Sequence, residues 1–219
     1  PAVAVANASD GPLNGLTFAV KDIFDVAGYP TGCGNPQKRR ESEADSPQEH
    51  APAVAALLDA GANPNAANDE GETPLMAAAR AGDVDSATLL LDAGADVNAT
   101  EQWGGQSALM WASAQQHPAM VALLIERGAD VDARGVVRQW ARKIITEPRP
   151  KDMNKGGFTP LLYAAREGCI ECARQLLAGG ADPDLADPER VTPLNLALLN
   201  LHFDFAAFMI EAGADVDKW

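Results

Sequence analysis

The stretch that decides the fold is GETPLMAAARAGDVDSATLLLDAGADVNA, residues 71–99. Thr73 can accept a hydrogen bond at a helix start, and Pro74 follows it where no amide donor is needed. Small alanines then fill a first helix, which Gly82 ends because glycine adopts the left-handed backbone conformation at low cost. A second stretch with paired aliphatic residues runs up to Gly94. The segment therefore predicts two short helices joined by a turn.

The same pattern recurs along the chain. The pair Gly-Ala returns at steps of 33, 34, 52 and 33 residues, and 52 is 33 plus an insertion of 19. Segments like Thr-Pro-Leu keep this spacing, and so do paired aliphatic residues. One unit is too small to bury its apolar face alone, so successive units must stack and share a core. The repeat therefore predicts an all-α solenoid.

These repeated residues resemble the ankyrin repeat. The resemblance covers residues 51–219 and implies an ankyrin-repeat solenoid, all-α, made of helix–turn–helix units with finger turns. A half repeat and four full repeats are expected at residues 51–68, 69–99, 100–134, 155–186 and 187–219. Gln116 and Leu201 stand where the family ends its first helix with glycine, so we expect those turns to be strained or reshaped.

The resemblance implies binding of a protein partner on the concave surface, which the finger turns and first helices form. The position two residues after each Thr-Pro-Leu leucine points into that groove in the family. The residues at this position are Ala77, Trp111, Tyr163 and Leu196. Together with the neighbouring Arg80, Trp103, Gln106 and Arg166, they are the expected partner-binding residues. Exposed aromatic and arginine side chains are typical of binding surfaces. The alternative is that these rings pack against adjacent fingers or the inserted segment.

A basic insertion at residues 135–154 interrupts the spacing. From Arg134 to Lys155, seven basic and two acidic residues give +5, which leaves −19 for the rest of a chain whose net charge is −14. The side chains that define it are Arg138, Trp140, Arg142, Lys143, Arg149 and Lys151. Two interpretations stay open: a basic finger that meets an acidic partner or the acidic array, and a solvated finger folded over the groove. The negative net charge of the whole chain argues against nucleic acid as a partner.

A different pattern occupies residues 11–36, which include GLTFAVKDIFDVAGYPTGCGNP at 15–36. It resembles the amidase signature family, hydrolases of carboxylic amides that use two serines and a lysine. Lys21 falls on that lysine, but the serines of this chain lie in no Gly/Ser-rich run, so we expect no catalysis. Residues 1–36 are then an amidase-like fragment rather than an independent domain, and residues 37–50 are a charged linker.

This opening leaves a second function hypothesis beside the interaction module. The chain would then be a non-catalytic accessory or truncated region of an amidase signature hydrolase. The segment APAVAALLDAGA at 51–62 fits either family, so it is a natural crossover point for a fusion.

Composition supplies the remaining expectations. No apolar run reaches about 18 residues, so we expect no membrane span. Three cysteines do not make a disulfide framework, which favours a reducing, cytoplasmic setting. Cys169 and Cys172 have metal-ligand spacing without a second pair, so we expect structural cysteines, no metal and no cofactor. The last unit is apolar where a cap should be polar, which predicts another unit after Trp219 or self-association.

Overall fold

The computed structural model describes residues 50–138 and 156–218 of the chain. The predictions for the amidase-like fragment, for Lys21 and for the linker lie outside these residues. The same holds for most of the predicted basic insertion, namely for Trp140, Arg142, Lys143, Arg149 and Lys151.

Short helices make up the described part of the chain, together with turns and two isolated β-bridges. In chain order the helices are α3 (His50–Asp59), α4 (Pro74–Ala81), α5 (Val84–Asp92), α6 (Ala108–Ala114), α7 (Pro118–Glu126), α8 (Pro160–Glu167), α9 (Ile170–Ala178), α10 (Pro193–Leu199) and α11 (Phe203–Glu211). Within these described ranges, no helix is long and apolar enough to cross a bilayer.

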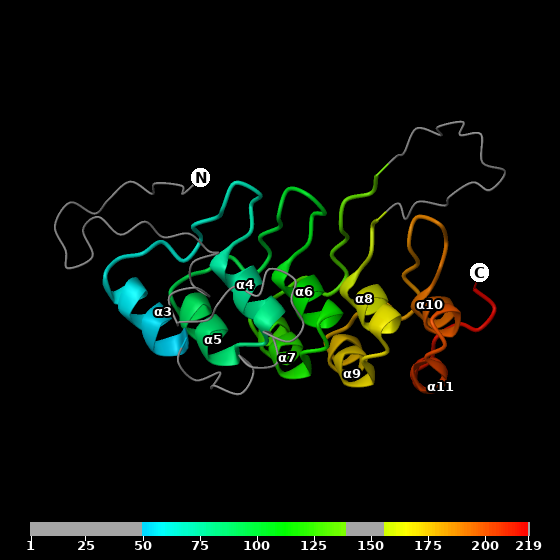
Figure 1. Cartoon of the computed structure of the whole chain (residues 1–219). Coiled ribbons are helices and arrows are strands. Elements are labelled where there is room, and N and C mark those ends of the chain that lie inside the picture. Colours follow the sequence, from blue (N-terminus) through cyan, green and yellow to red (C-terminus); the bar gives the residue numbers. More distant parts are fainter. Residues whose placement is uncertain (1–49, 139–155, 219) are drawn as a thin grey trace, which may run out of the picture.

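The helices form two rows that run along the array (Figure 1). The first helices α4, α6, α8 and α10 make one row, and the second helices α3, α5, α7, α9 and α11 make the other. Neighbours in each row are in contact, and each first helix also packs on the second helix that follows it. The helix α3 has no first helix before it within the described residues, and it packs on α5. This arrangement confirms the predicted all-α solenoid.

One apolar interior joins the units. A single cluster of buried residues extends from Val54 in α3 through Leu90, Leu124 and Leu176 to Met209 in α11. Each of these side chains is at most 6% exposed. The shared core that the repeat spacing predicted is therefore present, and most of the stability of each helix pair must come from its neighbours.

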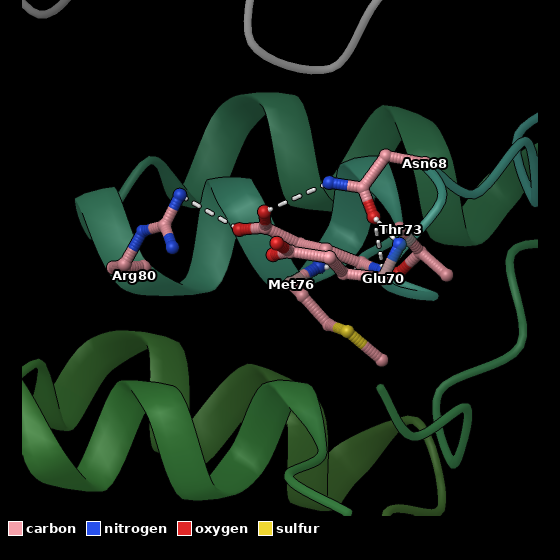
Figure 2. Close-up of polar contacts among 6 residues, drawn as sticks. Asn68, Glu70, Thr73, Met76 and Arg80 are labelled. Atoms are coloured by element: carbon pink, nitrogen blue, oxygen red, sulfur yellow. Dashed lines mark hydrogen bonds and ion pairs between the residues drawn. The ribbon is translucent and has the colours of Figure 1, made fainter. Parts of the chain in front are cut away.

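Each first helix begins at a hydroxyl residue, as predicted. The side-chain oxygen of Thr73 accepts a hydrogen bond from the N–H of Met76 at 3.3 Å, at the start of α4 (Figure 2). The corresponding bonds join Ser107 to Met110 (3.4 Å), Thr159 to Leu162 (3.3 Å) and Thr192 to Asn195 (3.3 Å). These bonds satisfy an amide that has no partner within the helix.

The turns after the first helices are left-handed whether or not glycine is present. Gly82 and Gly168 have φ values of 74° and 73°, and Gln116 and Leu201 hold φ values of 60° and 65° at the corresponding places. Of the two alternatives expected for these turns, the structure shows the strained one, because both side chains keep the left-handed conformation. A Cβ on Gly82 would lie 2.7 Å from Nδ1 of His117, whose other ring nitrogen lies 3.2 Å from the carbonyl of Arg80.

A ladder of side-chain hydrogen bonds ties the turns after the second helices to one another. Asn65 accepts from the N–H of Asp96 (2.7 Å) and donates to the carbonyl of Gly94 (3.0 Å). Asn98 makes the same two bonds one unit further on, at 2.8 Å and 3.2 Å. Each asparagine thus pairs with both a donor and an acceptor of the next turn.

Aspartate replaces asparagine in the later steps of this ladder. Asp132 accepts from the N–H of Asp182 at 3.1 Å, and Asp184 accepts from the N–H of Asp215 at 2.9 Å. Because an ionised carboxylate has no donor, these steps carry the first bond of the asparagine pair and lack the second.

Candidate functional site

The expected partner-binding residues lie on the first helices and on the finger turns that project from them (Figure 1). Trp111 of α6, Tyr163 of α8 and Leu196 of α10 are half-buried, so part of each side chain reaches solvent. Ala77 of α4 differs because only 2% of its surface is exposed. The expectation that Ala77 forms part of an accessible apolar column is therefore not met.

Arg80 is held in place between a carboxylate and an aromatic ring. Its guanidinium nitrogen lies 2.7 Å from Glu72, and its guanidinium carbon lies 5.3 Å from the centre of the Trp111 ring. Glu72 also accepts a 3.4 Å hydrogen bond from the side-chain amide of Asn68, and Figure 2 shows this series of contacts from Arg80 to Asn68. The cation–π contact joins the first helices of two successive units.

Tyr163 is the centre of a second group. Gln106 donates a 2.6 Å hydrogen bond to the hydroxyl of Tyr163, and the guanidinium carbon of Arg166 lies 5.0 Å from the ring centre. Phe158 meets the same ring edge-to-face, with 5.5 Å between centroids. Burial raises the pKa of Tyr163, although the Gln106 hydrogen bond and the Arg166 charge act in the opposite direction. The structure thus brings three of the predicted residues together.

Trp103 lies on a finger turn, and 73% of its surface is exposed. The guanidinium carbon of Arg138 lies 4.1 Å from its ring centre, and an Arg138 nitrogen donates to its carbonyl. Val136 donates a 2.7 Å backbone hydrogen bond to Gly104 on the same finger. The first residues of the predicted insertion therefore pack on the Trp103 finger, which is the arrangement that the alternative interpretation describes for this ring.

Glu101 shapes this finger, and sequence reasoning missed it. The residue is 8% exposed, and its carboxylate accepts hydrogen bonds from the backbone amides of Trp103, Gly104 (2.7 Å) and Gln106 (2.9 Å). A side-chain acceptor recurs at the same place in other fingers. Asn68 accepts from the amides of residues 70 and 72, and Asp187 accepts from those of residues 189 and 191. That recurrence is the signal that would have identified Glu101.

The cysteine pair also departs from expectation. Cys169 and Cys172 are buried, as predicted for structural cysteines, but a disulfide joins them. The cysteine count predicted no disulfide framework and did not indicate this single bond. The disulfide removes the support that the cysteine count gave to a reducing compartment.

Comparison with known proteins identifies the class of protein that this architecture defines. The family described as ankyrin repeats (3 copies) matches residues 44–135 and 138–218. These matches cover well over half of the chain, so the chain belongs to the ankyrin-repeat family. Proteins of this class are interaction modules, and that much of the predicted function is supported.

Particular relatives share the repeats over a small part of their own length. The chain is 32% identical to the ankyrin repeat and KH domain-containing protein mask-1 of Caenorhabditis elegans over 160 residues, which are 73% of this chain and 5% of that protein. It is 30% identical to the putative palmitoyltransferase ZDHHC13 of Danio rerio over 149 residues, 68% of this chain and 20% of that protein. The chain therefore spans a fifth or less of these relatives.

A third relative is an amidase, the class of protein that the start of the chain resembles. The chain is 52% identical to Amidase 1 of Arabidopsis thaliana over 56 residues, which are 26% of this chain and 13% of that protein. This match is compatible with the amidase-like fragment. The match of 56 residues is also longer than the predicted fragment at residues 1–36, so the similarity is more extensive than that fragment.

Proposed function

We propose that this chain is a non-catalytic interaction module that binds a protein partner on its concave surface. The observation that carries the proposal is the row formed by Arg80, Trp111, Tyr163 and Arg166 on three successive first helices. Tryptophan, tyrosine and arginine are the residues that most often dominate the binding energy of protein interfaces.

The contacts within this row support a surface that is organised before a partner arrives. Arg80 is fixed by Glu72 at 2.7 Å, and Tyr163 is fixed by Gln106 at 2.6 Å. Side chains already held in one geometry lose less conformational entropy on binding.

The test is an unbiased affinity capture with wild-type chain and with a Trp111→Ala/Tyr163→Ala double variant. We expect a set of proteins that the wild type retains and the double variant loses at least tenfold. Phe203→Ala is the matched control, because Phe203 is an exposed aromatic residue, 62% accessible, on a second helix. Circular dichroism of each variant shows whether it is folded. Equal capture by wild type and a folded double variant would refute the concave-surface proposal.

A second candidate function is favoured by the match to Amidase 1. In it the chain is a non-catalytic accessory or truncated region of an amidase signature hydrolase. The chain would then restore hydrolysis to a separate serine-bearing amidase fragment, and Lys21→Ala would abolish that activity. Amide hydrolysis by the purified chain alone would contradict both candidates, because each assigns no catalysis to it.

A further inference from the structure

The start of a second helix brings two particular side chains together in this fold. At the start of α5, Asp83 precedes the first helical residue and Ser86 follows three positions later. The carboxylate of Asp83 accepts from the N–H of Ser86 at 3.0 Å and from its hydroxyl at 2.6 Å. The backbone of the repeat therefore places these two side chains in direct contact, whatever their chemistry.

In α9 both of these positions are cysteine. Cys169 is the capping residue, and its sulfur accepts a 3.2 Å hydrogen bond from the N–H of Cys172. Their Cα atoms are 5.3 Å apart, within the range of about 4.4–6.8 Å that a disulfide needs. A disulfide joins the two residues in the structure. The two positions are thus in side-chain contact at the start of α9, as Asp83 and Ser86 are at the start of α5.

The two cysteine residues differ in exposure. Cys169 is 8% exposed and Cys172 is fully buried, so an external thiol or disulfide meets Cys169 first. A thiolate at Cys169 would face the amide end of α9, where the helix dipole stabilises negative charge. The flanking carboxylates are paired, Glu167 with Arg166 at 2.7 Å and Glu171 with Arg174 at 3.3 Å, which reduces their repulsion of a thiolate.

We propose that Cys169 and Cys172 are a reversible thiol–disulfide site that exchanges two electrons with small disulfides and thiols. In the oxidising direction, the Cys169 thiolate attacks one sulfur of glutathione disulfide, and one glutathione thiolate leaves. Cys172 then loses its proton and attacks the Cys169 sulfur of the mixed disulfide. The second glutathione leaves, so two thiols of the protein are oxidised and one glutathione disulfide is reduced to two glutathiones.

The reverse reaction restores the two thiols. A thiolate attacks the Cys169 sulfur, Cys172 leaves as a thiolate that takes a proton, and a second thiol releases the mixed disulfide. Cys169 lies between α8 and α9, Cys172 lies in α9, and both belong to the continuous core, so the state of the site changes the covalent constraint on one unit of the array.

The experiment is a redox titration of the folded chain in a Cys33→Ser background, which leaves only this pair. The protein is equilibrated at a series of ratios of glutathione to glutathione disulfide, quenched in acid and labelled with a maleimide. Mass spectrometry then gives the number of labels on each chain. We expect the label count to fall from two to zero as the ratio becomes oxidising, and to return to two on reduction without denaturant.

Two variants make the result specific. Cys169→Asp/Cys172→Ser copies the natural Asp83–Ser86 pair, so it should fold and show no electron exchange. Cys172→Ser alone should stop at a glutathione adduct on Cys169, because the second step is missing. The proposal is overturned if two labels persist at every ratio, if glutathione adducts are the end product of the two-cysteine chain, or if reduction requires unfolding.

Discussion

The hydrogen-bond ladder between successive turns gives a prediction that can be worked out bond by bond. In Asn98→Ala the chain loses the bond from the N–H of Asp130 (2.8 Å) and the bond to the carbonyl of Gly128 (3.2 Å). A protein hydrogen bond contributes about 0.5–1.5 kcal/mol net, and both of these are exposed to solvent, so the lower half of that range applies. We expect Asn98→Ala to lower the free energy of unfolding by about 1–2 kcal/mol.

The exchange of asparagine and aspartate separates the two bonds. Asn98→Asp keeps the acceptor and loses the donor, so it should cost about 0.5–1 kcal/mol. Asp132→Asn supplies the donor that this step lacks and removes one negative charge from an acidic chain, so it should stabilise by a similar amount. The two substitutions are therefore expected to have opposite signs.

Thermal and urea unfolding, followed by circular dichroism, measure these effects. For a chain of this size, 1 kcal/mol corresponds to a shift of roughly 2–4 °C in the melting temperature. Midpoints should be compared, since repeat arrays can depart from two-state unfolding. If Asn98→Asp and Asp132→Asn shift stability in the same direction, or if Asn98→Ala is neutral, the ladder does not stabilise the array as argued.

Three further predictions concern other features. Gly82→Ala should lower the free energy of unfolding by at least about 1 kcal/mol more than Gly94→Ala does. Both glycines have positive φ, but a Cβ at Gly82 would also meet His117, whereas a Cβ at Gly94 would meet open space. Equal melting temperatures of the two variants would contradict this. Because burial raises the pKa of Tyr163, the contribution of its neutral form to stability is present below about pH 10 and is lost as pH rises through the folded-state pKa. The melting temperature of Tyr163→Phe should therefore fall less between neutral and alkaline pH than that of the wild type. Leu199 is 72% exposed on α10, the first helix of the last unit, and it should support self-association of the chain. We therefore expect Leu199→Glu to lower the mass that light scattering measures at high protein concentration. A wild-type chain that stays monomeric would refute this prediction.

The helix pairs could be predicted from the sequence because each unit repeats the same local chemistry. A hydroxyl residue before proline or alanine, a turn residue and a paired aliphatic stretch fix each helix without knowledge of the neighbours. The position of Gln116 in the repeat marked its turn as strained or reshaped, and its φ of 60° shows that the turn is strained.

The binding surface was less predictable because it depends on how particular side chains meet across units. Trp111, Tyr163 and Arg166 could be placed on one face from the resemblance to the ankyrin repeat. The burial of Ala77 and the contact of Arg138 with Trp103 depend on packing that the period does not specify. Glu101 was missed because a buried carboxylate is recognised by the amides around it, and these come from the conformation of the finger.

The insertion between α7 and α8 shows what a continuous, neighbour-to-neighbour core permits. It separates two units widely in the chain, yet α6 still packs on α8 and α7 on α9, because the added residues leave from the finger and not from the helices. Such an array can lengthen, shorten or acquire a foreign segment by recombination at its loops, and no new interior has to be evolved each time. For the same reason, a gene fusion at the edge of the repeats would leave every existing helix pair with the support it already has.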